Sequence, residues 1–354
     1  MDLKKLGFDN WFQEQLNNYS RHDLKLARVT TVNRDNYLVR TEYGEVPAEL
    51  SGRMIFNIDT NLDMPTVGDW GLVQSIDSHS MVIIHDILPR KTVLKRKDSS
   101  KSIAYQLIAA NIDTAFIMQG LDSNFNINRL ERYLVMVNEN KIDPIILFSK
   151  CDLLSHTELQ QRTSELKHIN QKYPVISFSN KTEQGFEQVV RKLKPGKTYC
   201  MIGSSGVGKT TLLNKLLGSK RFAVNTVREK DEKGRHTTAR RQLVFLENGA
   251  MIIDTPGMRE LGNFGVETGI SETFEKIYAL ANECRFKDCT HIHEKDCAVV
   301  KAVNAGIINR KSYENFLKIK KETEFYDLTY YEKRQRDKSF GKMCKQVMKS
   351  LRKK

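Results

Sequence analysis

The sequence lacks the long apolar runs that a membrane-spanning protein needs. No stretch approaches the 18 consecutive apolar residues that indicate a transmembrane helix. The first seven residues, MDLKKLG, contain no apolar signal segment of the kind that directs secretion. We therefore expect a cytoplasmic protein without a membrane partner, whose six cysteines remain reduced.

Acidic residues are fewer than basic ones. The chain has 57 Lys and Arg against 43 Asp and Glu, and its net charge of +14 favours a polyanionic partner. The charge is uneven, because the tail at residues 331–354 holds ten Lys or Arg and only two acidic residues. Residues 91–102 are also basic and are expected to form a linker. Charge alone leaves open that the tail only aids solubility.

The pattern of strands and helices divides the 354 residues into several domains. After a lead-in at residues 1–24, five short strand candidates within residues 25–90 predict a small closed β-barrel, most naturally of the oligonucleotide-binding (OB) type. A generic barrel without a role in nucleic-acid binding stays open. Within residues 103–265, alternating strands and helices predict an α/β domain with a mainly parallel sheet. Residues 266–330 are expected to be mostly helical.

The boundaries of these elements follow from turn-forming residues and hydrophobic periodicity. In the barrel, strands are expected at residues 26–32, 36–43, 46–56, 69–76 and 81–88. In the α/β domain, strands are expected at residues 114–119, 144–149, 174–179, 198–203, 242–247 and 250–255. Helices are expected at residues 127–140, 155–172, 185–194, 272–283 and 298–320.

The most specific motif is the run GSSGVGKT at residues 203–210. It follows a strand-like run and precedes a helix-like run, which is the context of a phosphate-binding loop, or P-loop. In such a loop the backbone N–H groups surround phosphate oxygens, and the helix N-terminus adds a partial positive charge. We expect Lys209 to reach the β- and γ-phosphates and Thr210 to ligate Mg²⁺. The expected phosphate-site residues are Gly203, Ser204, Ser205, Gly206, Val207, Gly208, Lys209, Thr210 and Thr211.

A second motif concerns the base of the nucleotide. Guanine presents two neighbouring donors, which the carboxylate of Asp152 can accept together, whereas adenine has an acceptor at N1. The stem of Lys150 can lie along the base, and a second loop after an apolar run can back it. By itself the Ser-Lys-x-Asp pattern also fits a solvated turn after a strand. The expected base-site residues are Ser149, Lys150, Cys151, Asp152, Ser179, Asn180 and Lys181.

A third motif, Asp254-Thr-Pro-Gly257, ends another apolar run. Asp254 would hold Mg²⁺ through water, and the Gly257 N–H could bond a γ-phosphate oxygen and release it after hydrolysis. Between the P-loop and this strand lies a polar segment with Thr237 and Thr238. One of these threonines could cover Mg²⁺ in the triphosphate state.

The sequence lacks the glutamine that usually follows this glycine and orients the attacking water in Ras-like enzymes. Met258 stands there, and a thioether can neither position nor polarise water. We expect slow intrinsic hydrolysis that a partner completes. His236, beside the threonines, is the candidate for positioning the water, and a solvent-exposed loop histidine is the alternative.

Three of the six cysteines cluster in the C-terminal third of the chain. Cys284, Cys289, His291 and Cys297 offer three thiolates and one imidazole, which suits a closed tetrahedral Zn²⁺ site. With all four positions filled, such a metal would be structural and would hold a segment that has little core of its own. The odd number of cysteines in this cluster and the expected reducing compartment argue against disulfides. His293 is a competing ligand.

The order of the motifs is reversed relative to Ras-like GTPases, in which the P-loop comes first and base recognition last. Here residues 149–152 and 179–181 precede the P-loop, which is the order of a circularly permuted GTPase. Together with the Gly-Arg-His-Thr-Thr run at residues 234–238 and the cysteine cluster, this order resembles the ribosome small subunit-dependent GTPase A family. The resemblance extends from about residue 25 to about residue 320.

The resemblance implies an OB barrel, a circularly permuted P-loop GTPase domain and a helical zinc domain with His291 as a ligand. It implies GTP hydrolysis at a low rate that the small ribosomal subunit raises, with binding to that subunit and its rRNA late in maturation. We expect a monomer with one Zn²⁺ and with Mg²⁺ bound beside GTP. Ser149 departs from the family, which usually has an asparagine that bonds the base and braces the P-loop. One lost neutral hydrogen bond predicts an affinity lower by about 1 kcal/mol.

Two other functions fit parts of the sequence. An RNA-binding scaffold with a purely structural nucleotide is supported by Met258 and Ser149. A P-loop ATPase or small-molecule kinase would share the phosphate loop, but Asp152 argues against it. Phosphate release with and without small ribosomal subunits separates the scaffold from the GTPase, and competition between GTP and ATP separates the kinase.

Overall fold

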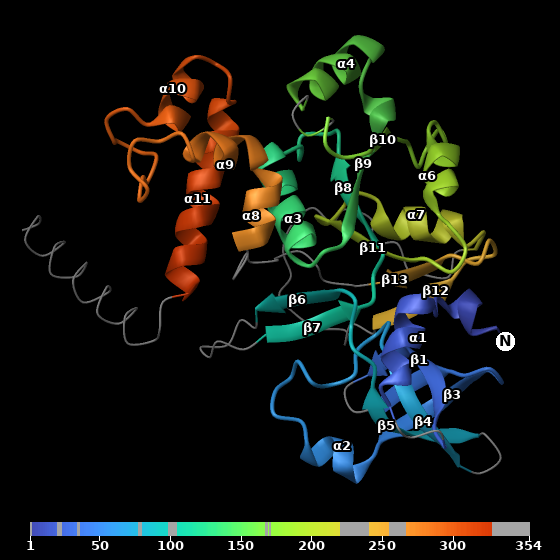
Figure 1. Ribbon diagram of the computed structural model, residues 1–354. Coiled ribbons are helices and arrows are strands. Elements are labelled where there is room, and N and C mark those ends of the chain that lie inside the picture. The colour runs from blue at the N-terminus through green and yellow to red at the C-terminus, as the bar shows by residue number, and fades with distance from the viewer. Residues whose placement is uncertain are drawn as a thin grey trace, which may run out of the picture. The chain divides into compact units, whose positions relative to one another are not determined.

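The computed structural model describes residues 2–19, 23–33, 36–76, 80–97, 105–166, 169, 171–219, 241–254 and 267–327. The chain divides into two compact units, Met1–Gly262 and Asn263–Lys354. Every strand among the described residues belongs to the first unit, and the described part of the second is helical (Figure 1). No helix in the described ranges is long and apolar enough to cross a membrane.

The first unit contains a five-stranded barrel. Its strands are β1 (Lys25–Asn33), β2 (Asn36–Arg40), β3 (Glu45–Leu50), β4 (Trp70–Ile76) and β5 (Met81–Ile87). They are ordered β1-β2-β3-β5-β4, and pairing of β1 with β4 closes the barrel. Small apolar side chains such as Val29, Val39 and Val82 fill the interior. The predicted OB barrel is therefore confirmed.

Helix α2 (Gly52–Phe56) follows β3, so the strand expected over residues 46–56 is wrong beyond Leu50. The strand ends because the Ser51 Oγ accepts a hydrogen bond from the Met54 N–H at 3.1 Å and caps the helix. Met54 enters the barrel core, whereas Phe56 is 88% exposed. The apolar residues that suggested a strand thus belong to a helix, in which Met54 faces the core and Phe56 faces solvent.

A mainly parallel sheet forms the rest of the first unit. Its strands are β8 (Thr114–Gly120), β9 (Asp143–Ser149), β10 (Val175–Ser177), β11 (Thr198–Gly203), β12 (Arg241–Phe245) and β13 (Met251–Asp254). Their order is β10-β9-β8-β11-β13-β12, with only β12 antiparallel to its neighbour β13. The predicted α/β domain is confirmed, and the carboxyl ends of five parallel strands meet along one edge of the sheet.

Helices cover both faces of this sheet. They are α3 (Ile127–Glu139), α4 (His156–Glu165), α6 (Phe186–Lys192) and α7 (Lys209–Leu216). On one face α3 contributes Leu130 and Leu134 to a core that includes Ile117. On the other face α6 and α7 pack with Phe116 and its neighbours. Adjacent residues of β8 therefore point to opposite faces, and both are buried, as expected for a central parallel strand.

The barrel and the sheet are joined by strand pairing. β1 pairs with β12 through Thr31 and Val32, so one continuous sheet runs from β10 to β4. Strands β6 (Val93–Lys97) and β7 (Tyr105–Ala110) form a separate antiparallel pair (Figure 1). The expected linker at residues 91–102 is therefore a strand over residues 93–97. The sequence did not show the alternation of apolar and polar residues that is typical of a strand, because three of its five residues are Lys or Arg.

The first residues are more tightly held than the predicted lead-in. A 3₁₀ helix, η1 (Leu3–Leu6), and α1 (Asn10–Asn17) precede the barrel. Leu6 and Phe12 are buried, and the ring centroids of Phe8 and Trp70 lie 5.1 Å apart. Beneath them the buried Arg28 donates a 2.8 Å hydrogen bond to the Thr198 Oγ1, at the start of β11.

The second unit is mostly helical, as predicted. It contains α8 (Glu267–Thr273), α9 (Glu275–Ala281), α10 (Ala298–Asn304) and α11 (Arg310–Asp327). The helix expected at residues 272–283 is interrupted at Phe274, and the one expected at residues 298–320 is interrupted after Asn304. Phe274 and Phe316 pack together with ring centroids 5.5 Å apart, which joins α11 to the start of α9. The basic tail at residues 331–354 lies outside the described residues.

Candidate nucleotide site and metal cluster

The P-loop joins the end of β11 to the start of α7. A Cβ on Gly203 would lie 2.5 Å from the Met118 carbonyl oxygen of β8, so no larger residue fits there. Gly208 has φ +94°, and a Cβ on it would lie 2.6 Å from the Asn180 Nδ2. Glycine at 208 thus allows both the left-handed turn into α7 and the close approach of Asn180. The loop has the strand–loop–helix context expected from the sequence.

Lys209 closes the loop in this structure. Its Nζ donates to the carbonyl oxygens of Gly203 and Ser204 at 2.7 and 2.8 Å. Asp254, at the end of β13, is half-buried, and burial raises the pKa of its carboxyl while the nearby Lys209 ammonium partly offsets the rise. The ammonium of the first residue of α7 and the carboxylate of the last residue of β13 thus lie at the same edge of the sheet. Thr210 and Thr211 follow in the first turn of α7 and are also half-buried.

Two residues of the expected base site are hydrogen-bonded to the P-loop. The buried Ser149 Oγ donates to the Val207 carbonyl oxygen at 2.7 Å. The Asn180 Nδ2 donates to the Gly208 carbonyl oxygen at 3.2 Å. The motifs that precede the P-loop in the chain therefore fold against it. Because the Ser149 hydroxyl itself bonds the P-loop, the brace expected to be lost with the asparagine is present.

The loop after β10 is organised by Ser179. This fully buried residue accepts hydrogen bonds at its Oγ from the N–H groups of Lys181 and Thr182, at 3.0 and 3.1 Å. The turn holds Asn180 toward the P-loop and leaves Lys181 exposed. The loop is also tied to α7 by an ion pair of 2.7 Å between Glu183 and Lys215.

Asp152 lies in a short 3₁₀ helix, η3 (Cys151–Leu153), directly after β9, and is half-buried. Its neighbour Cys151 is buried in the apolar core, and burial raises the pKa of that thiol. The backbone N–H of Cys151 donates to the Phe178 carbonyl oxygen at 3.3 Å. Only the backbone of Cys151 therefore remains as a candidate contact, and Asp152 supplies the carboxylate at the edge where β9 and β10 end.

The structure adds one residue that sequence reasoning missed. Lys150 forms an ion pair of 2.6 Å with Asp122, which follows β8. Nothing in the sequence links the two, because 28 residues separate them and Asp122 belongs to no known pattern of the P-loop motifs. The signal that could have found Asp122 is positional: it is an acidic residue just beyond a buried strand, at the edge where nucleotide motifs gather.

Five expected residues of the switch segments lie outside the described residues: His236, Thr237, Thr238, Gly257 and Met258. Of the residues expected in the Asp254–Gly257 motif and in the threonine segment, only Asp254 lies among the described residues. The catalytic, magnesium and water-positioning roles assigned to the others stay predictions.

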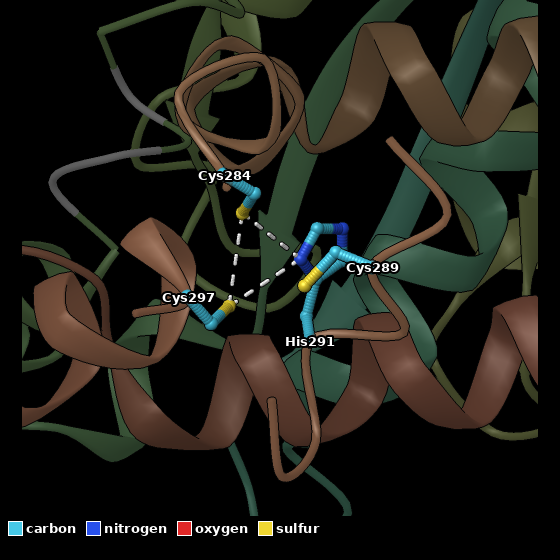
Figure 2. Close-up of side chains that lie close together, drawn as sticks. All are labelled: Cys284, Cys289, His291 and Cys297. Atoms are coloured by element: carbon cyan, nitrogen blue, oxygen red, sulfur yellow. Dashed lines mark hydrogen bonds between the residues drawn. The ribbon is translucent and has the colours of Figure 1, made fainter. Parts of the chain in front are cut away.

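Four side chains of the second unit meet at one point (Figure 2). The ligand atoms of Cys284, Cys289, His291 and Cys297 all lie within 4.8 Å of one another. The His291 Nδ1 is 3.5 Å from the sulfurs of Cys284 and of Cys297, and these two sulfurs are 3.8 Å apart. His293 is not a member of this cluster. The expected donor set is therefore brought together, and it can hold a metal ion.

Helix ends and one carboxylate shape this cluster. Burial acts to raise the pKa of Cys284, but hydrogen bonds from the Val299 and Ala298 N–H groups at the start of α10 bring it below its ordinary value. The half-buried Glu294 side chain accepts hydrogen bonds from the N–H groups of Thr290 and Ile292 at 2.8 and 3.0 Å. These bonds help to shape the loop that carries His291.

Comparison with known proteins agrees with this arrangement. The family model described as RsgA GTPase matches residues 87–264, and curated relatives match almost the whole chain. The chain belongs to the RsgA GTPase family. Small ribosomal subunit biogenesis GTPase RsgA 2 of Vibrio parahaemolyticus is 36% identical over 99% of this chain and 94% of its own. The RsgA 1 protein of Bacteroides thetaiotaomicron is 37% identical over 96% of this chain and 95% of its own.

Solved structures show the same fold. The crystal structure of YjeQ from Thermotoga maritima is 26% identical, with a TM-score of 0.63, and covers 84% of this chain and 97% of that one. YloQ, described as a circularly permuted GTPase, has a TM-score of 0.62 and 21% identity over 88% and 99% of the two chains. This RsgA-family chain is thus a circularly permuted GTPase and a GTP hydrolase, as the order of its motifs predicted.

Proposed function

We propose that this GTPase binds the small ribosomal subunit through its rRNA and acts late in the maturation of that subunit. Its relatives are named for biogenesis of the small ribosomal subunit, which supports this partner. The net charge of +14, with much of it in the tail at residues 331–354, supports contact with RNA. The protein works as a monomer in the cytoplasm.

The observation that carries the nucleotide site is the contact between its two halves. The Ser149 Oγ bonds the Val207 carbonyl, and the Asn180 amide bonds the Gly208 carbonyl. A nucleotide whose phosphates lie on the P-loop would therefore have its base within the reach of the segment that carries Asp152. In this site the carboxylate of Asp152 accepts the N1–H and the amino group of guanine.

Magnesium would be held at the same edge of the sheet. Thr210 supplies a hydroxyl and Asp254 a carboxylate, both of which are oxygen donors of the kind that Mg²⁺ prefers. Thr237 or Thr238 completes the site in the triphosphate state, and the Gly257 N–H bonds the γ-phosphate. Lys209 leaves its two carbonyl partners and moves to the β- and γ-phosphates.

The metal of the cysteine cluster is zinc in this proposal. A tetrahedral ion with Zn–S bonds of about 2.3 Å and a Zn–N bond of about 2.0 Å places its sulfurs ~3.8 Å apart and each sulfur ~3.5 Å from the nitrogen. Three ligands have this spacing: the sulfurs of Cys284 and Cys297 are 3.8 Å apart, and each is 3.5 Å from the His291 Nδ1, while all four ligand atoms lie within 4.8 Å. The four ligands leave no position for a substrate, so the ion stabilises the fold of the second unit.

The deciding experiment measures GTP turnover with and without purified small ribosomal subunits, at low and raised salt. We expect a low rate alone, a clear increase with subunits, and loss of the increase at raised salt because phosphate contacts are screened. A rate unchanged by subunits would contradict the proposal and favour an RNA-binding scaffold. His236→Ala then tests the water-positioning role, which is excluded if the stimulated rate stays within about twofold of wild type.

A further inference from the structure

The loop between β8 and α3 borders the nucleotide edge of the sheet. Gly120 ends β8 opposite Ser149 in the strand register, and the Leu121 N–H donates to the Ser149 carbonyl oxygen at 2.9 Å. The buried Gln119 holds the far side of the loop, because its Nε2 donates to the carbonyl oxygens of Asn124 and Asn126 at 3.4 and 3.3 Å. The loop is therefore fixed at both ends beside the residues expected to read the base.

Asp122 has little freedom within this loop. Its Oδ1 accepts the Asn124 N–H at 3.1 Å, and its Oδ2 accepts the Lys150 ammonium at 2.6 Å. A Cβ on Gly120 would lie 2.9 Å from the Asp122 Oδ1, so the strand end also leaves room for the carboxylate only because it is glycine. Burial acts to raise the pKa of Asp122, but the bonds from Lys150 and Asn124 lower it, so the group is ionised at neutral pH.

The pair also fixes Lys150. This residue has φ +61°, a left-handed backbone that starts η3 and therefore sets the direction of Asp152. Its ammonium is held by Asp122 at the far end of the four-carbon stem, and the side chains of the pair are only 32% and 18% exposed. The stem is thus held at both ends, by the backbone turn and by the ion pair, next to the segment whose carboxylate is expected to bind guanine.

We propose that Asp122 is a positioning residue for guanine nucleotides, acting through Lys150. By anchoring the ammonium, it keeps the lysine stem extended as the apolar wall against which the base lies. This inference rests on the proposed nucleotide site. It concerns the nucleoside end of the ligand, which GTP and GDP share, so both lose affinity when Asp122 is replaced. The phosphate end is bound by other residues, so the catalytic rate constant is unaffected.

The experiment compares Asp122→Asn with wild type for GDP affinity, using a fluorescent guanine nucleotide, and for the KM and kcat of GTP hydrolysis. We expect the Kd of GDP and the KM of GTP to rise by about fivefold, as for one partly exposed ion pair, while kcat stays within about twofold. KM reports affinity when chemistry is slow relative to dissociation, which is the regime that the expected low intrinsic rate implies. The preference for GTP over ATP stays unchanged, because a stem along the base face touches either purine.

Three variants make the test specific. In a Lys150→Met background, Asp122→Asn should cause no further loss, since the residue through which it acts is gone. Asp122→Glu, which keeps the charge, should restore most of the affinity. Glu187→Gln serves as the control, because it makes the same charge change at a different ion pair. That pair joins Glu187 to Arg191 on α6, is 3.2 Å long and is largely exposed.

The outcomes separate this inference from the function beneath it. An unchanged Kd in Asp122→Asn, or an equal loss with and without Lys150, overturns the positioning role. A fall in kcat with an unchanged KM overturns it too, because the effect would then lie at the phosphates. If Asp152→Asn also leaves the GTP preference intact, the failure belongs to the proposed base site rather than to Asp122. Thermal unfolding of each variant shows whether the fold is retained.

Discussion

Ser149 and Val207 are joined by a hydrogen bond of 2.7 Å, although 58 residues separate them in the chain. Ser149 ends β9, and Val207 lies in the P-loop that follows β11. Both strands flank β8, so the bond crosses over the carboxyl end of β8 and fastens the base motif to the phosphate motif. Permutation changes which motif is synthesised first, but the sheet still brings the same two loops into contact.

The first prediction concerns this bond. Ser149→Ala removes a hydroxyl at a fully buried position and leaves the Val207 carbonyl without that donor. An unsatisfied buried acceptor costs about 1–3 kcal/mol, so we expect a lower melting temperature and weaker binding of GTP and GDP alike. Calorimetry and nucleotide titration measure the two effects. Ser164→Ala is the matched control, because that exposed hydroxyl bonds a carbonyl within α4. Equal behaviour of the two variants would show that the brace is unimportant.

The second prediction concerns base specificity. Asp152→Asn replaces one of the two acceptor oxygens with an NH₂ donor. This donor would oppose the amino group of guanine, which is also a donor, but would pair with the carbonyl that xanthine has in its place. We expect GTP affinity to fall at least tenfold, as for a lost charge-assisted hydrogen bond, and affinity for xanthosine triphosphate to rise. Competition between the two nucleotides gives the preference directly. A variant that still favours GTP would place Asp152 away from the base.

Motif spacing and periodicity were sufficient for the strands of the sheet, since β8, β9 and β11 begin and end within one residue of their expected bounds. These strands are buried on both faces, so their apolar runs are continuous and end where polar loop residues start. The predictions from sequence were wrong where a local and a long-range interaction compete. Ser51 caps α2 inside an apolar run, and β6 exists only because it pairs with β7.

The candidate site was predicted in its residue types but not in its contacts. The brace by Ser149 could not be foreseen, because a serine and an asparagine place their polar atoms at different distances from the backbone and only the fold decides which reaches Val207. Asp122 was missed for the same reason, since its partner Lys150 lies on the neighbouring strand's loop. The cluster of three cysteines and one histidine was predictable because its residues are close in sequence and their chemistry restricts the alternatives.

The third prediction separates the two histidines of the metal loop. His291→Ala removes a ligand, so we expect the bound zinc to fall below one per chain and the second unit to melt at lower temperature. His293→Ala should keep its zinc, because its imidazole is not in the cluster although its loop is the same. Elemental analysis after gel filtration measures the metal content. Zinc loss in the His293 variant alone would reverse the ligand assignment.

The fourth prediction concerns the loop that presents His291. The Glu294 carboxylate accepts the Thr290 hydroxyl and several N–H groups of that loop, and these hydrogen bonds hold its pKa well below the ordinary range. Glu294→Gln keeps one acceptor oxygen but loses the charge, so we expect faster loss of zinc to a chelator at unchanged ligand set. Glu283→Gln is a suitable control on the same unit. Chelator-dependent release, followed with a zinc-sensitive dye, gives the rates, and equal rates would assign the loop's shape to the metal alone.

The last prediction uses the raised pKa of Asp254. Burial disfavours its charged form, so the folded state binds a proton more tightly than the unfolded state does. The resulting penalty is absent below the unfolded pKa of an aspartate, grows as the pH rises from that value to the folded pKa, and is complete above the folded pKa. Asp254→Asn should therefore raise the melting temperature of the nucleotide-free protein at neutral pH, and the gain should vanish in acid. The same variant should lose Mg²⁺-dependent hydrolysis, because a carboxamide is a poorer ligand. If the variant is instead less stable at neutral pH and fully active, Asp254 stabilises the fold and is not needed to bind the metal. The expected result is the opposite: a residue that binds the metal at a cost in stability.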